Sequence, residues 1–230
     1  MNIQGLNKVT LLDYPGRVAC TVFTGGCDLR CPFCHNSQLV LHPTFSPIDE
    51  EDVFALLRRR RGIIDGVAIT GGEPLLQPDI EDFISRVREL GYSVKLDTNG
   101  THPARLAHLL DAGLVDHVAM DIKNSPERYP ETVGIPGFDV TPIRESVALL
   151  VGGSTGYEFR TTVVAPLHDE ESMLGIGRLI KGAGRYFLQG FADSGALIAP
   201  EGLRAVPREE MEKFAAIVAP FVGSAELRGV

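Results

Sequence analysis

Short runs of β-branched and apolar residues alternate along the chain with segments of helical periodicity, and this alternation limits the folds open to it. Six such pairs can be counted in the 230 residues, with strands expected at 18–24, 66–70, 93–97, 116–120, 157–164 and 185–189. Repeated strand–helix units with right-handed crossovers form parallel sheets. Because eight units are needed to close a full barrel, six units predict an α/β fold of the partial (βα)6 barrel type.

The helices are expected between and after these strands, and several have recognisable ends. The first is expected to begin at Ser46-Pro47-Ile48-Asp49, with proline at the first helical position, and to end near Arg61-Gly62. The others are expected at 79–90, 102–112, 143–151, 169–181 and 207–219. No repeat of fixed period and no interdomain linker interrupts the pattern, so a single domain, 1–230, is predicted.

Composition and charge exclude several functional classes. The net charge of −8 argues against a general nucleic-acid binder, which needs a basic face to neutralise phosphates. No apolar run approaches the roughly 18 residues of a membrane helix, and the start of the chain lacks the features of a signal peptide. The sequence therefore predicts a cytoplasmic protein with no membrane or nucleic-acid partner.

Three of the four cysteines lie within eight residues, in a loop at 25–36. Thiolates hold zinc and iron–sulfur clusters, and a reducing compartment favours such a site over disulfides. Cys27, Cys31 and Cys34 are the candidate ligands, and a cubane that they held would keep one iron open for another molecule. Cys20, inside an apolar strand, is expected in the core. One cluster is the most that this cysteine set can hold.

Polar motifs follow the next three strands at the point where each ends. These motifs are Gly71-Gly72-Glu73-Pro74, Asp97-Thr98-Asn99-Gly100 and Asp121-Ile122-Lys123. In barrels of this kind the active site lies at the carboxyl ends of the strands. We therefore expect the motifs to share one rim with the cysteine loop.

The cysteine spacing CxxxCxxC, an aromatic residue before the last cysteine, and GGEP on the next strand together resemble the radical S-adenosylmethionine (SAM) enzymes. Three further segments are similar to the activating enzymes of glycyl radical enzymes: Leu12-Asp13-Tyr14-Pro15-Gly16, Cys34-His35-Asn36 and Met120-Asp121-Ile122-Lys123. Within that group the chain most resembles activases of anaerobic ribonucleoside-triphosphate reductase. The resemblance covers nearly the whole length.

The resemblance implies a set of cofactors and contacts. It implies a 4Fe-4S cluster on Cys27, Cys31 and Cys34, with SAM bound at the open iron. Gly71, Gly72 and Glu73 would bind the methionine ammonium, and Phe33 would lie against the adenine. The residues that match positions around the ribose, the carboxylate or a monovalent cation are Asp97, Thr98, Asp121 and Lys123, with the cation expected near Asp97 and Asp121.

The implied activity is reductive cleavage of SAM to a 5′-deoxyadenosyl radical, which abstracts hydrogen from a glycine of a partner enzyme. The implied partner is a glycyl radical enzyme, here the large subunit of anaerobic ribonucleotide reductase, and the implied electron donor is flavodoxin or ferredoxin. No general base is required, so no catalytic residue is expected beyond the cluster and the cofactor. The sequence assigns no role to Gln189 or to the segment 124–156.

Other interpretations stay open at this point. A radical SAM enzyme that acts on a small molecule, such as a 7-carboxy-7-deazaguanine synthase, would share the fold and the cluster. A Cys3His zinc site that uses His35, or another non-catalytic metal-binding module, would explain the cysteines but not GGEP. Asp97 and Asp121, at strand ends, could instead cap the helices that follow.

Overall fold

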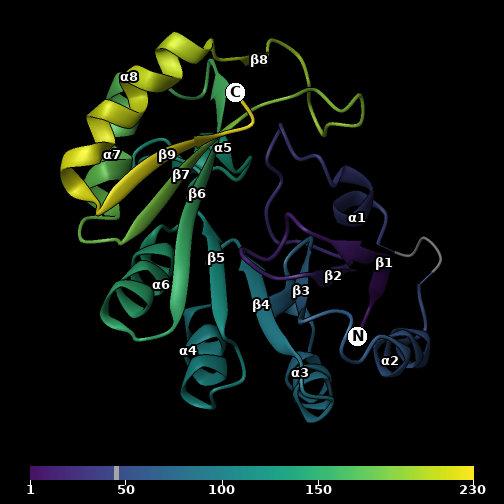
Figure 1. Cartoon of the computed structure of the whole chain (residues 1–230). Helices are drawn as coiled ribbons and strands as arrows, with labels where there is room; N and C mark the ends of the chain where they lie inside the picture. Colours follow the sequence, from purple (N-terminus) through teal and green to yellow (C-terminus); the bar gives the residue numbers. More distant parts are fainter. Residues whose placement is uncertain (44–46) are drawn as a thin grey trace. The chain divides into compact units, whose positions relative to one another are not determined.

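The computed structural model describes residues 1–43 and 47–230, and these residues form two compact units (Figure 1). Unit 1 comprises Met1–Asp28, Gln38–Thr98 and Ala104–Val118, and unit 2 comprises Leu29–Ser37, Asn99–Pro103 and Ala119–Val230. The prediction of one domain, 1–230, stays a prediction. Among the described residues, no helix is both long enough and apolar enough to cross a bilayer.

Unit 1 is built on four strands in the order of the chain. These are β1 (Ile3–Thr10), β2 (Ala19–Thr24), β3 (Gly66–Gly71) and β4 (Ser93–Thr98). β1 is antiparallel to β2, whereas β2, β3 and β4 run parallel, with Thr24 opposite Gly71 and Ile69 opposite Leu96. Because β2 and β3 end in register, the loops that follow them begin at the same height.

The helices of unit 1 are α2 (Glu50–Arg59), the short η1 (Pro74–Leu76), α3 (Ile80–Glu89) and most of α1 (Ser37–Leu41) and α4 (Pro103–Asp111). α2 begins three residues later than the sequence suggested, because Asp49 is its N-cap and its carboxylate accepts the N–H of Glu51 at 2.8 Å. Ser46, the predicted cap, lies outside the described residues. α3 ends before Gly91, whose φ of +88° is that of a C′ glycine.

Unit 2 contains the second set of parallel strands and their helices. Its elements are α5 (Tyr129–Thr132), α6 (Thr141–Gly152), β6 (Gly156–Ala165), α7 (Glu170–Leu179), β7 (Arg185–Gly190), β8 (Arg204–Ala205), α8 (Arg208–Val218), η2 (Ala219–Phe221) and β9 (Ser224–Arg228). β5 (His117–Asp121) contributes residues to both units. β6, β7 and β9 are parallel neighbours, and α7 and α8 lie side by side against them (Figure 1).

Each unit has an apolar core that the alternation of strand and helix predicts. In unit 1 the fully buried strand residues include Val22, Val67, Ile69, Val94 and Leu96. In unit 2, buried side chains of β6 and β7 meet those of α7 and α8; they include Phe159, Leu188, Ile176, Met211 and Phe214. Cys20 is fully buried on β2, as expected, and burial raises the pKa of its thiol to about 12.

All six predicted strands are present, and the sheet elements that the sequence missed lie near the two ends of the chain. β1 pairs antiparallel with β2, so it falls outside the strand–helix alternation. β9 is a five-residue strand, SAELR, with no fully buried residue. Neither segment has the apolar run by which the other strands were found.

Candidate functional site

The cysteine loop passes from unit 1 to unit 2 between Asp28 and Leu29. Cys27 therefore belongs to unit 1, whereas Cys31 and Cys34 belong to unit 2, and none of the three is in a disulfide bond. Within residues 1–43 and 47–230, no three His, Cys, Asp or Glu side chains form a ready-made metal site. Each half of the loop is supported by hydrogen bonds within its own unit.

In unit 1, the two loops that follow β2 and β3 are joined through their backbones. The N–H of Gly72 donates to the carbonyl of Thr24 at 2.9 Å, and the N–H of Glu73 donates to the carbonyl of Gly26 at 2.8 Å. A Cβ on Gly72 would lie 1.8 Å from the Gly26 oxygen, and one on Gly71, where φ is +119°, would lie 2.3 Å from the Thr24 nitrogen. Both positions therefore require glycine.

The turn before Cys27 is fixed by a side chain that the sequence did not single out. The amide of Gln77 donates to the carbonyl of Gly25 at 2.9 Å, and its oxygen accepts the N–H of Asn2 at 2.9 Å. Gln77 is buried, three residues after Pro74. Its position thus links GGEP to the glycine turn through a hydrogen bond that sequence spacing alone does not reveal.

Glu73 is fully buried, and its Oε1 accepts two hydrogen bonds. One comes from the N–H of Leu75 and the other from the hydroxyl of Thr98, both at 2.9 Å. The first bond caps η1, which gives Glu73 a structural role in addition to any ligand contact. The second places Glu73, in the loop after β3, in direct contact with Thr98 at the end of β4, and both are predicted site residues.

Asp97, at the end of β4, is paired with a lysine of the same strand. Lys95 is 2% exposed and Asp97 is 15% exposed, and the ammonium of Lys95 donates to Asp97 Oδ1. An ion pair this deeply buried is retained when its geometry satisfies both charges. The sequence predicted Asp97 but missed Lys95, because a lysine inside a strand pattern usually faces solvent.

In unit 2, Cys31 and Cys34 lie in one tight turn in which the N–H of Cys34 donates to the carbonyl of Cys31 at 3.0 Å. Phe33, between them, is 4% exposed. Burial raises the pKa of Cys31 to about 11, and the ammonium of Lys123 acts in the opposite direction. A nearby cation favours the thiolate, which is the form that binds metals.

The turn of Cys31 and Cys34 is supported by two distant segments of unit 2. The N–H of Arg30 donates to the carbonyl of Val133 at 2.9 Å, and a Cβ on Gly134 would lie 2.4 Å from the Arg30 oxygen. On the other side, the N–H of Ala199 donates to the carbonyl of Pro32 at 3.0 Å. The segment 124–156, which the sequence left without a role, thus helps to hold the cysteine turn.

Asp121 and Lys123, predicted as site residues, form a charged group with Arg160 of β6. Lys123 Nζ lies 3.0 Å from Asp121 Oδ2, and Arg160 Nε lies 3.0 Å from Asp121 Oδ1. Burial alone would raise the pKa of Asp121, but the two cations lower it to about 2. The Asp121 carboxylate accepts from cationic side chains and does not cap a helix, which answers the alternative that the sequence left open.

The backbone of Lys123 is held on both sides by buried side chains. Its N–H donates to the hydroxyl of Tyr129 at 3.2 Å, and its carbonyl accepts from Nε2 of His168 at 2.8 Å. Nδ1 of His168 accepts the N–H of Val164 at 3.1 Å, which assigns the proton of the neutral ring to Nε2. Sequence reasoning assigned no function to His168, since a lone histidine carries no pattern that reveals such a contact.

The donor sets of the two halves fit a cluster and an amino-acid-like ligand. Three cysteines outside disulfide bonds supply the soft sulfur ligands that iron–sulfur clusters use. The Gly26–Gly72 contact leaves no room for a side chain, so backbone atoms line that position. Three other residues named in the sequence analysis are divided between the units: Phe33 and Gln189 belong to unit 2, and Asp97 belongs to unit 1.

A family model described as "Radical SAM superfamily" matches residues 21–172. The "Putative glycyl-radical enzyme activating enzyme" of Methanocaldococcus jannaschii is 30% identical over 99% of this chain and 96% of its own length. The pyruvate formate-lyase-activating enzyme of Clostridium pasteurianum is 32% identical over 60% of each chain. The 7-carboxy-7-deazaguanine synthase of Halobacterium salinarum is 35% identical over 44% of this chain and 37% of its own length.

Among solved structures, Streptococcus suis SuiB bound to precursor peptide SuiA matches with a TM-score of 0.69 and 13% identity, over 91% of this chain and 48% of that one. The family match and the structural likeness confirm the predicted fold, α/β with the partial (βα)6 barrel of the radical SAM type. The family implies a 4Fe-4S cluster and SAM. The chain belongs to the radical SAM superfamily and is an enzyme homologous to glycyl radical enzyme activases.

Proposed function

We propose that this enzyme generates a glycyl radical on a partner protein. The observation that carries the proposal is the likeness, over 99% of this chain and 96% of the relative, to the glycyl-radical activating enzyme from Methanocaldococcus jannaschii. The match to the 7-carboxy-7-deazaguanine synthase spans 44% of the chain, which favours the activase over a small-molecule enzyme. The cytoplasm is the proposed compartment.

Cys27, Cys31 and Cys34 are the proposed ligands of the cluster. When bound, the cluster and SAM supply one-electron reductive cleavage of a sulfonium and a radical able to take a hydrogen atom from glycine. Lys123 stabilises the thiolate of Cys31 by its charge. The backbone bonds at Arg30 and Pro32 hold the turn of Cys31 and Cys34 in one conformation, which a cluster site needs.

The loops after β3, β4 and β5 supply the proposed contacts to SAM. Gly71, Gly72 and Glu73 bind the methionine ammonium, because a buried carboxylate and close backbone carbonyls suit a cation. Phe33 lies against the adenine. Asp97, Thr98, Asp121 and Lys123 surround the ribose, the carboxylate or a monovalent cation; for that cation, Lys95 competes at Asp97, and Lys123 and Arg160 compete at Asp121.

The proposed partner is the large subunit of anaerobic ribonucleoside-triphosphate reductase, and reduced flavodoxin or ferredoxin is the proposed electron donor. The partner assignment rests on three segments of sequence: Leu12-Asp13-Tyr14-Pro15-Gly16, Cys34-His35-Asn36 and Met120-Asp121-Ile122-Lys123. The first of them begins with an exposed apolar side chain in unit 1, since Leu12 is 90% exposed, and the preceding Leu11 is 70% exposed.

The test is anaerobic reconstitution with iron and sulfide, followed by reduction in the presence of SAM and the candidate reductase. Formation of 5′-deoxyadenosine together with a glycyl signal in electron paramagnetic resonance supports the proposal. Cleavage of SAM without a glycyl signal on the reductase rejects this partner but still supports the proposed cleavage of SAM. Absence of SAM cleavage with a strong reductant rejects the proposed function as a whole.

A further inference from the structure

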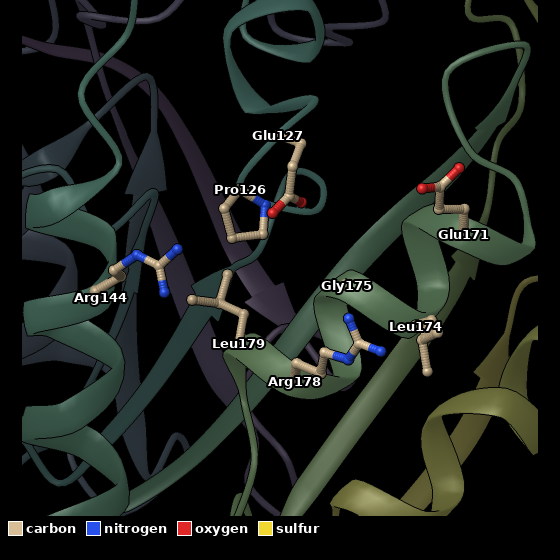
Figure 2. Close-up of a pocket in the computed structure, with 8 residues that line it drawn as sticks. All are labelled: Pro126, Glu127, Arg144, Glu171, Leu174, Gly175, Arg178 and Leu179. Carbon is tan, nitrogen blue, oxygen red and sulfur yellow. The ribbon is translucent and has the colours of Figure 1, made fainter.

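A pocket of about 520 Å³ in unit 2 plays no part in the proposed radical chemistry (Figure 2). It lies between the loop that follows β5 and the helices α6 and α7, and it is lined by Pro126, Glu127, Arg144, Glu171, Leu174, Gly175, Arg178 and Leu179. Pockets that take small molecules measure roughly 300–1,000 Å³. The pocket is therefore large enough for a metabolite.

The charged side chains of this pocket are not neutralised by one another. Figure 2 shows Arg144 on α6, Arg178 and Glu171 on α7, and Glu127 on the loop, around the same space. Among residues 1–43 and 47–230, no carboxylate forms an ion pair with Arg144 or Arg178, and Glu127 and Glu171 likewise accept no side-chain hydrogen bond. Four charged groups that face one space without pairing are available to a ligand.

The floor of the pocket depends on a glycine within α7. A Cβ on Gly175 would lie 2.4 Å from Cβ of Ser125 and 3.5 Å from Oε2 of Glu127. Ser125 is 4% exposed, and its N–H is held by Oδ1 of Asn124 at 2.7 Å, so it has little freedom to move away. A glycine inside a helix costs about 1 kcal/mol relative to alanine. Here it lets the loop approach α7 and brings Glu127 to the pocket.

We propose that this pocket binds a nucleoside monophosphate. Arg144 and Arg178 have exposed side chains on two helices that line the pocket, so both can turn toward one phosphate, to which arginine presents planar pairs of N–H donors. Ribose hydroxyls and an exocyclic amino group are donors that Glu127 and Glu171 can accept, as acidic residues accept ribose hydroxyls in dinucleotide-binding folds. The half-buried side chains of Pro126, Leu174 and Leu179 offer an apolar surface for a base.

The charge balance of the pocket selects one phosphate over three. Two arginines and two glutamates sum to zero, so a triphosphate would bring several negative charges to a site with no net positive charge. The two carboxylates would repel it. We expect AMP to bind more tightly than ATP, and adenosine, which leaves both arginines without an anion, to bind more weakly than AMP.

The test is isothermal titration of the full chain with AMP, ATP, adenosine and inorganic phosphate, in separate experiments. SAM is kept saturating, so that AMP cannot occupy the proposed SAM site. Supporting results are saturable binding of AMP, loss of at least about tenfold in affinity in both Arg144→Gln and Arg178→Gln, and no change in Arg208→Gln, an exposed arginine of α8. Thermal melting confirms that each variant folds.

Absence of saturable AMP binding up to about 1 mM, or equal binding in the wild type and both arginine variants, overturns the proposal. If inorganic phosphate binds as tightly as AMP, the pocket does not recognise the nucleoside, and that part of the proposal is overturned. Glu127→Gln with Glu171→Gln is expected to reverse the preference and favour ATP. The titration needs no reductant and is repeated on chain without a cluster, where SAM does not block its site and loss of AMP binding in the two arginine variants identifies the pocket. Failure of the radical chemistry would therefore leave this result intact.

Discussion

At the scale of single residues, the contact between Gly72 and Gly26 gives the sharpest prediction. In Gly72→Ala the new Cβ would lie 1.8 Å from a carbonyl that already accepts the N–H of Glu73. Relief requires the two loops to separate, so we expect a loss of stability of about 2 kcal/mol or more. Urea unfolding measures the stability, and titration of the reconstituted protein with SAM measures the accompanying loss of affinity.

A second glycine provides the matched control for that substitution. A Cβ added at Gly152, at the end of α6, would have no other atom within 4 Å, and the φ of this residue is not positive. Gly152→Ala should leave stability within about 0.5 kcal/mol of wild type. If Gly72→Ala unfolds at the same urea concentration as Gly152→Ala, the loops that follow β2 and β3 do not approach each other as closely as described.

His168 predicts a specific dependence of stability on pH. Burial lowers the pKa of its ring in the folded state, although hydrogen bonds to Lys123 and Val164 act in the opposite direction. Below the ordinary histidine pKa of about 6.5 the unfolded chain binds this proton more readily than the folded one, so the contribution of His168 is present above that pH and is lost below it.

His168→Gln tests this contribution, because an amide can still donate to the Lys123 carbonyl but does not titrate. We expect the difference in unfolding free energy between wild type and variant to change between pH 7 and 5.5, with wild type losing more as the pH falls. The exposed His42 gives the control, His42→Gln. A constant difference across this range would show that His168 is not buried as a neutral ring.

At this scale the sequence predicts the residues with unusual chemistry and misses those that support them. Cysteine spacing and paired glycines are informative because few other structures need them. Gln77, Arg160 and His168 contact their partners across 52, 39 and 45 positions of sequence. Nothing local marks such contacts, since they arise when separate strands and loops are brought together by folding.

At the scale of elements, the pairing of β9 with β7 is stabilised by one side chain. Arg228 of β9 donates to both oxygens of Glu158, at 2.9 and 3.1 Å, and lies 3.3 Å from the centre of the Phe187 ring. Glu158 is 1% exposed. Arg228→Gln leaves a buried carboxylate without its cation, and we expect it to cost about 3 kcal/mol in urea unfolding.

An ion pair at the surface provides the control that separates the effect of burying a charge from the effect of losing one. Arg208 of α8 pairs with Glu212, which is 55% exposed, so Arg208→Gln should cost less than about 0.5 kcal/mol. The double variant Glu158→Gln with Arg228→Gln should recover part of the loss, since no charge is then buried. Equal costs for the two single variants would contradict the buried pairing of β9.

The sequence predicted those strands that carry their own apolar run. Runs such as ACTVFT and GVAITG are buried on both faces and leave a clear sequence pattern. β9 instead depends on the Glu158–Arg228 pair, and β1 on its pairing with β2. Strands stabilised by pairing rather than by apolar runs cannot be found from periodicity alone.

At the scale of the whole molecule, the arrangement of the cysteines predicts how much iron the chain holds. Cys20 is fully buried inside the apolar strand β2, outside the loop at 25–36 that carries the other three cysteines, so we do not count it as a ligand. The remaining three cysteines suffice for one cubane. We expect reconstitution to give about 4 iron atoms and about 4 sulfides per chain.

The serine variants then distinguish ligands from core residues. Cys27→Ser, Cys31→Ser and Cys34→Ser should each lose most of the iron, whereas Cys20→Ser should retain it and lose stability instead, because a hydroxyl replaces a thiol in the apolar interior. Iron analysis and melting temperature, measured on the same samples, separate the two effects. Full iron content in Cys27→Ser would exclude Cys27 as a ligand of the cluster. Cys31 and Cys34 would then need other partners within unit 2.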